Sequence, residues 1–106
     1  DAGALDAYRQ NFEGKERIGG AEQFRSVQQA ARILSRQGKH DQALKTLARI
    51  NAAKQNGTWR ATTFAIEGDI LTAAGRKPEA RAAYKAALAK PGLPGSWREA
   101  VKMKLR

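Results

Sequence analysis

The chain has 106 residues, enough for one small domain with a modest core that needs no disulfide or metal to fold. It contains no cysteine, which excludes disulfides, thiolate metal sites and thiol nucleophiles. Twenty Lys and Arg against ten Asp and Glu give a formal charge of +10, so anionic partners are expected to concentrate at its surface.

No apolar run approaches the roughly 18 residues of a membrane-spanning helix, and no signal peptide is evident. The chain begins with Asp1 rather than methionine, which we interpret as a processed product or an excised part of a larger protein. The sequence does not separate a cytoplasmic from an exported location, so the compartment stays open.

Helix-forming residues dominate, because alanine is abundant and proline occupies only three positions. Residues 2–12 are predicted to form a short helix with Leu5, Tyr8 and Phe12 on one face, followed by a loop over 13–20. The next helix is predicted over 22–37, where apolar residues recur at helical spacing and Gly38 ends the run. Its apolar face comprises Phe24, Val27, Ala30, Ala31 and Leu34.

The following helix is predicted to begin near Asp41, which suits either the cap or the first turn. After a loop at 51–57, a helix is predicted from Thr58 to about Ala74, with Gly75 closing it. Pro78 suits the first turn of the next helix, where its missing N–H costs nothing. That helix is expected to break at residues 90–95, which read KPGLPG.

A last helix is predicted to start at Ser96, because Ser96 and Glu99 match the S-x-x-E capping box. The segments NGTWR at 56–60 and PGSWR at 94–98 hold the two tryptophans of the chain. We interpret them as one structural joint used twice rather than as halves of a binding site. In each, the glycine breaks the chain, the hydroxyl caps a helix and the tryptophan lies in its first turn.

Two stretches of the chain align with each other at an offset of 37 residues, which pairs Gly38 with Gly75. At this offset large residues fall on large ones and small on small at five of six paired positions, and Ile50 with Ala87 is the exception. The paired positions are Val27 with Phe64, Ala31 with Gly68, Leu34 with Leu71, Ala43 with Ala80, Leu47 with Tyr84 and Ile50 with Ala87. A helix–turn–helix unit that recurs at such a period is typical of an α-solenoid.

Residues 61–91 resemble the tetratricopeptide repeat. Gly68 stands at the small residue of the first helix, Gly75 at the turn, Ala80 and Tyr84 at the small and aromatic residues of the second helix, and Pro91 near the terminating proline. The unit at 24–52 matches less well, with Ala31 for the glycine and Leu47 for the aromatic residue. The resemblance implies an all-α fold, a short right-handed superhelix of about two repeats within a single domain over 1–106. Its expected parts are an N-terminal helix and loop (1–20), the two repeats (21–55 and 58–92) and a capping helix (96–106).

In the tetratricopeptide repeat family, the first helix of each unit lines a concave groove that holds extended peptides. The resemblance therefore implies partner-binding residues on the two first helices: Arg25, Gln28, Arg32, Ser35, Arg36, Thr62, Ala65, Asp69 and Thr72. The asparagine and lysine set with which some members grip a C-terminal carboxylate is not reproduced. A chaperone tail is therefore not the expected ligand.

The sequence gives little support for a catalytic or metal-binding site. His40 stands alone in a turn, without cysteine or a second histidine, and is expected to be solvated. Glu67 and Asp69 are two residues apart on a helix, so they point apart, and an ion pair with a neighbouring arginine is the more ordinary expectation. The aromatic side chains are expected in the core rather than in a base-stacking platform. We therefore predict a non-enzymatic protein with no cofactor and no metal.

Two basic rows remain: Arg25, Arg32 and Arg36 on one helix, and Lys77, Arg81 and Lys85 at i, i+4 and i+8 on another. The predicted function is a scaffold that binds an extended, acidic or polar segment of a protein partner, through charge-assisted hydrogen bonds from arginine. The alternative is a basic helical module that binds nucleic acid or another polyanion. Surface solvation alone would also explain both rows.

Overall fold

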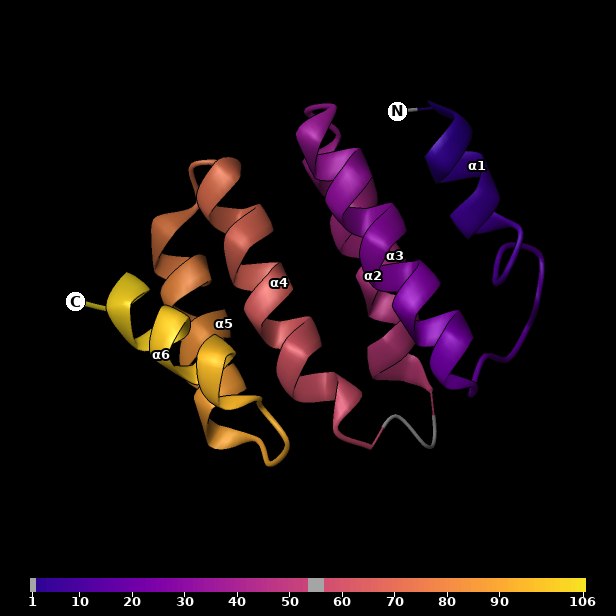
Figure 1. The fold of residues 1–106 in the computed structure, drawn as a ribbon. Coiled ribbons are helices and arrows are strands. Elements are labelled where there is room, and N and C mark those ends of the chain that lie inside the picture. Colours follow the sequence, from indigo (N-terminus) through magenta and orange to yellow (C-terminus); the bar gives the residue numbers. More distant parts are fainter. Residues whose placement is uncertain (1, 54–56) are drawn as a thin grey trace. The chain divides into compact units, whose positions relative to one another are not determined.

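The computed structural model describes residues 2–53 and 57–106, and over these residues it is all helix, with no strand (Figure 1). The prediction of an all-α fold is confirmed. The helices are α1 (Ala2–Arg9), α2 (Ala21–Arg36), α3 (His40–Ala52), α4 (Trp59–Ala73), α5 (Lys77–Ala89) and α6 (Gly95–Lys104).

The chain divides into two compact units, residues 1–56 and 57–106. In the first unit, α2 and α3 form a helical hairpin and α1 packs against α2. In the second, α4 and α5 form the hairpin and α6 packs against both of them. Each unit thus consists of one helix–turn–helix pair with one additional helix.

The turn inside each hairpin has the same geometry. Gly38 and Gly75 adopt φ of +81° and +79°, the left-handed region that favours glycine. After each glycine the next amide donates to a carbonyl five residues back, Lys39 to Leu34 and Arg76 to Leu71, at 2.9 Å in both cases. This is the Schellman arrangement, which satisfies carbonyls that the helix end leaves without partners. The predicted stop at both glycines is confirmed, and the 37-residue repeat is visible in the backbone.

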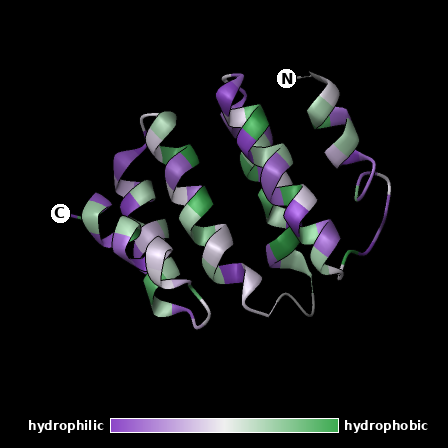
Figure 2. Ribbon diagram, viewed as in Figure 1, coloured by the Kyte–Doolittle hydropathy of each residue, from purple (hydrophilic) through white to green (hydrophobic). Residues whose placement is uncertain are grey.

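The first unit has its core along α2, where two buried rows run side by side. The apolar face predicted from the sequence is buried at all five positions, Phe24, Val27, Ala30, Ala31 and Leu34. Ser26 and Ile33 form the second row. Asn11, just after α1, donates from Nδ2 to Ser26 Oγ at 2.6 Å, so the second row faces the segment that follows α1. Figure 2 shows hydrophobic and hydrophilic residues alternating along α2 as this packing requires.

The second unit depends on a close approach of α5 to Gly68 of α4. A Cβ atom at position 68 would stand 2.5 Å from Cε1 of Tyr84, a separation that real Cβ atoms do not reach. Tyr84 is only 4% exposed, because its ring lies in the space that the missing side chain leaves. Around it, Ala80, Ala83 and Ala87 complete the buried face of α5.

Several predicted boundaries hold and others are wrong. Asp41 lies in the first turn of α3 and Pro78 in the first turn of α5, as expected. The first helix ends at Arg9 rather than at residue 12, because the chain continues in turns in which Glu13 and Phe12 both donate to the carbonyl of Arg9. Phe12 is nevertheless buried, so its predicted core role does not need the helix.

The repeated joint at the tryptophans is wrong in its details. Helix α6 begins at Gly95 with Pro94 as its N-cap, so Ser96 lies inside the helix and makes no capping bond. Thr58 is the N-cap of α4 but likewise makes no side-chain capping bond, and its side chain lies against Gly92 instead. Gly57 has φ of +50° whereas Gly95 is helical, so the two glycines differ in backbone conformation and are not equivalent positions of one joint. Asn56 lies outside the described residues.

Gly68→Leu is expected to lower the free energy of unfolding by about 1–3 kcal/mol, because the new side chain must displace the Tyr84 ring. Chemical denaturation followed by circular dichroism measures this change. Ala73→Leu adds the same side chain to an exposed position of α4 and should change stability by no more than about 0.5 kcal/mol. Equal effects of the two variants would refute the close approach.

Ser96→Ala is expected to leave stability within about 0.5 kcal/mol of the parent, because the hydroxyl makes no capping bond in α6. A working capping box would instead lose about 1 kcal/mol on this change. The same denaturation measurement decides, and a loss of that size would restore the capping box predicted from the sequence.

Candidate functional site

The predicted partner-binding residues fall on two helices, one in each unit. Arg25, Gln28, Arg32, Ser35 and Arg36 lie on α2, and Thr62, Ala65, Asp69 and Thr72 lie on α4. The two sets are described separately because each unit has its own internal contacts.

The arginines of α2 form one row, which we call the α2 arginine row: Arg25, Arg32 and Arg36. Their spacing of seven and four residues places them on one side of the helix, about 160° from the buried row that contains Val27 and Leu34. Arg25 and Arg36 are exposed and Arg32 is half-buried. Over the described part of the chain, neither Arg25 nor Arg36 has an acidic partner. Arg25 and Arg36 therefore present guanidinium groups that can still bind carboxylates.

The two other α2 residues are held within the protein. Gln28 is only 6% exposed, so the expectation that it would reach a partner does not fit its position. Ser35 Oγ lies 3.0 Å from Nδ1 of His40, across the corner between α2 and α3. His40 is half-buried as the first residue of α3, so the expectation of a freely solvated histidine is corrected. Together, Ser35 and His40 brace the turn.

The polar α4 residues are also occupied by bonds within their own unit. The Thr62 hydroxyl donates to the carbonyl of Trp59 at 3.2 Å, and the Thr72 hydroxyl donates to the carbonyl of Gly68 at 2.8 Å. Ala65 is buried at 3% exposure. Asp69 accepts from two side chains, which leaves this set with fewer groups to offer a partner than the sequence suggested.

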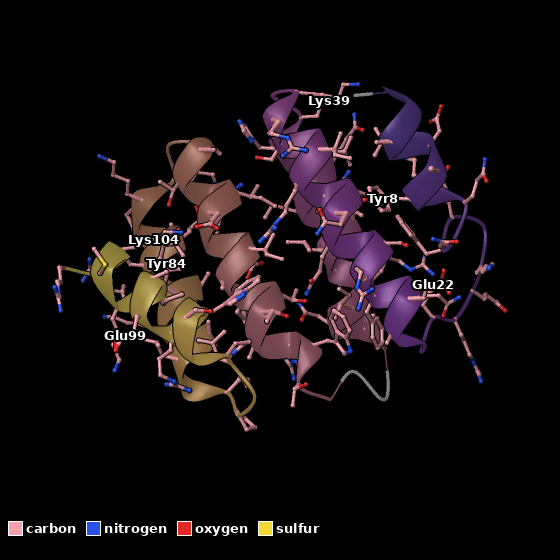
Figure 3. The ribbon with its side chains drawn as sticks, viewed as in Figure 1. Tyr8, Glu22, Lys39, Tyr84, Glu99 and Lys104 are labelled. Atoms are coloured by element: carbon pink, nitrogen blue, oxygen red, sulfur yellow. The ribbon has the colours of Figure 1, made fainter. Side chains whose placement is uncertain are left out.

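Asp69 is the centre of a small polar cluster that joins the three helices of the second unit. The Tyr84 hydroxyl of α5 donates to Asp69 Oδ1 at 2.5 Å, and Lys104 Nζ of α6 lies 2.6 Å from the same oxygen. Lys104 also lies over the Tyr84 ring, 5.6 Å from its centre, and Figure 3 shows these two side chains next to each other. The predicted partner of Asp69 was an arginine; the actual partners are a lysine and a tyrosine.

Burial and the hydrogen bond to Asp69 together raise the pKa of Tyr84 to about 12, with burial the larger cause. Both effects favour the neutral phenol, since the ionised form would be poorly solvated and would face a carboxylate. Glu67, on the same helix as Asp69, has its pKa raised by burial alone. The cluster therefore links α4, α5 and α6 and is not arranged for proton transfer at neutral pH.

The family comparison agrees with this architecture. A family model described as a tetratricopeptide repeat-like domain matches residues 3–106. The chain belongs to the tetratricopeptide repeat-like family. The predicted resemblance is thereby confirmed. Neither the curated proteins nor the solved structures yield a match to this chain.

Within this tetratricopeptide repeat-like fold, two structural features escaped sequence reasoning. Lys104 of α6 reaches Asp69 across 35 positions of sequence, a contact that no local pattern predicts. The alignment of Gly68 with the small residue of the repeat carried a partial signal, because a small residue at that position implies that two helices cross closely there.

The second missed feature is a surface hollow of about 430 Å³ beside the loop after α1. Its lining includes Ile18, Arg49 and Ala52, and Arg49 also donates to the carbonyl of Lys15. No motif in the sequence pointed to it, because it forms where a loop meets the last turn of α3.

Other site classes find no positive support in residues 2–53 and 57–106. No three His, Cys, Asp or Glu side chains gather there as metal ligands. The search for helices that could span a membrane, which covered those same residues, found none.

The raised pKa of Tyr84 predicts a late tyrosine ionisation. Absorbance at 295 nm should show a transition near pH 12 that Tyr84→Phe removes, and Asp69→Asn should lower its midpoint. Because the folded pKa exceeds the ordinary value of 10.0, the stability linked to this group is complete below about pH 10 and is lost as the pH rises towards 12. Circular dichroism at each pH tests that the chain is folded. A Tyr84 transition at pH 10 in the folded protein would contradict the cluster.

Proposed function

We propose that this chain is a non-catalytic protein-interaction module that binds an extended, acidic or polar segment of a protein partner along the α2 arginine row. Tetratricopeptide repeat-like domains generally mediate protein–protein interactions, which supports the general class. The observation that carries the finer proposal is the exposure of Arg25 and Arg36 without acidic partners in the described chain.

Arginine suits this role because its planar guanidinium can bind a carboxylate through two parallel hydrogen bonds. Arg25 and Arg36 are eleven residues apart, a rise of about 16 Å along the helix. An extended chain advances about 3.3 Å per residue, so about five residues of a partner would cover the row. Exposed ion pairs contribute little individually, and the affinity of a short segment is therefore expected to be modest.

The α4 residues Thr62, Asp69 and Thr72 are retained as a subsidiary part of the proposal. Their hydrogen bonds within the second unit occupy much of their capacity, and Asp69 would repel an acidic ligand unless Lys104 continued to neutralise it. Gln28, Ser35 and Ala65 would act through the shape of the helices rather than by direct contact. The proposal therefore centres on α2.

Binding of nucleic acid is the competing function, favoured by the formal charge of +10. Three of the seven aromatic residues weigh against it, and the other four are half-buried. Phe12, Phe24 and Tyr84 are buried at 4% exposure or less, so they cannot provide the stacking surface that single-stranded nucleic acid uses. Duplex binding through the backbone is an outcome of the experiment below.

The double change Arg25→Ala and Arg36→Ala is expected to weaken binding of a fluorescein-labelled peptide, Ser-Glu-Glu-Ser-Glu-Glu-Ser, by about three- to tenfold at physiological salt. Two charge-assisted contacts are lost, while the buried face of α2 is untouched. Fluorescence anisotropy measures the affinity, and amide shifts of ¹⁵N-labelled protein should locate the peptide on α2.

The matched control is Arg17→Ala with Lys45→Ala, which removes the same charge from exposed positions away from the row. It should weaken binding less than twofold. Equal weakening by both pairs would show that only net charge matters and would overturn the α2 assignment. A gel shift of mixed-sequence DNA or RNA at tens of micromolar protein, lost in the row variant, would assign the row to nucleic acid instead.

A further inference from the structure

We infer that the second unit carries a separate docking surface, formed by Lys77, Arg81 and Lys85 of α5, for an extended protein segment with carboxylates at alternate residues. We call these three residues the α5 basic row. This surface is independent of the α2 arginine row, since it lies on the second helix of the other hairpin.

The α5 basic row is regular and rigidly supported. Its residues recur every fourth position, a rise of about 6 Å per step, and all three are exposed. The neighbouring side of α5, about 110° around the helix from the row, is buried through Ala80, Ala83, Tyr84 and Ala87. Arg81 also donates from Nη1 to the carbonyl of Leu105 at 3.0 Å, which leaves its remaining guanidinium donors for a ligand.

The acidic groups of the second unit do not neutralise the row. This unit holds ten Lys and Arg against four Asp and Glu, a net charge of +6. Asp69 is paired with Lys104, and Glu79 is held by two hydrogen bonds from Arg76 at 2.9 and 2.6 Å. Glu67 lies half-buried on α4, and Glu99 is exposed on α6.

Lys77 and Lys85 accordingly have no acidic partner in the described chain. Lys102 and Arg106 add positive charge close to Arg81, since the carbonyl that Arg81 binds belongs to the turn between them. Exposed Glu99 is one turn before Lys102 on α6.

The spacing of the row selects an extended peptide. Alternate residues of a strand point to the same side and repeat every 6.6–6.8 Å, close to the ~6 Å steps of α5. Three carboxylates in the pattern Glu-x-Glu-x-Glu would thus meet three cations in register. The α2 arginine row lacks this match, because Arg25 and Arg32 are about 10.5 Å apart along the helix. No aromatic side chain is exposed on α5, which favours an acidic peptide over stacked bases.

The test compares two peptides of identical composition, Ser-Glu-Ser-Glu-Ser-Glu-Ser and Ser-Ser-Glu-Glu-Glu-Ser-Ser, titrated into ¹⁵N-labelled full chain at physiological salt. The alternating peptide is expected to bind at least threefold more tightly and to shift amides of α5. In the variant Lys77→Ala with Lys85→Ala, this preference should disappear. Far-UV circular dichroism should be unchanged, because both lysines are exposed and alanine favours helix.

Two control variants separate this inference from the proposed α2 function. Arg17→Ala with Lys45→Ala removes the same charge and should keep the preference, and so should Arg25→Ala with Arg36→Ala. Equal affinity of the parent for the two peptides, or a preference that survives loss of Lys77 and Lys85, would overturn the α5 surface while leaving α2 untouched. Tighter binding of a mixed-sequence DNA duplex than of the alternating peptide, mapped to α5, would overturn it in favour of nucleic acid.

Discussion

The close contact between Gly68 and Tyr84 is the constraint on which the second unit depends. Without a side chain at position 68, the Tyr84 ring lies directly against α4 and its hydroxyl reaches Asp69. Asp69 then receives Lys104, which fixes the last turn of α6 on the hairpin. The absence of a side chain at position 68 thus determines how α4, α5 and α6 pack together. The first unit has Ala31 and Leu47 at the corresponding positions and braces its corner differently, through Ser35 and His40.

The fold could be predicted largely because its main signals are local. The order of the helices follows from apolar residues at helical spacing, and the hairpin turns follow from Gly38 and Gly75, since few other residues adopt the positive φ that these turns require. The 37-residue repeat added a prediction that local reasoning lacks, namely that a helix–turn–helix unit recurs along the chain. The turns in both units then proved to share the same hydrogen bonds.

The failures have a common physical cause, which is competition from bonds that the sequence does not reveal. Ser96 matches a capping pattern, but Pro94 starts the helix earlier and the serine becomes an internal residue. Asp69 and Ser35 match positions of a peptide groove, and each also has a side-chain partner within the protein. Gln28 is buried at 6% exposure, which the sequence did not reveal, since a helical spacing predicts a side of the helix but not the depth of burial. Polar residues are therefore harder to assign than apolar ones.

The candidate surfaces are basic because the sequence holds twenty Lys and Arg against ten Asp and Glu. Acidic residues are scarce, and the folded second unit uses two of its four in ion pairs, Asp69 with Lys104 and Glu79 with Arg76. These two pairs engage one cation for each carboxylate, and the cations of the rows on α2 and α5 come from the surplus of Lys and Arg in the sequence. The formal charge of +10 says only that anions are attracted, whereas the rows give that attraction a direction and a spacing. Because α2 and α5 differ in spacing, two segments of equal charge need not bind them equally, and selectivity can arise without a pocket.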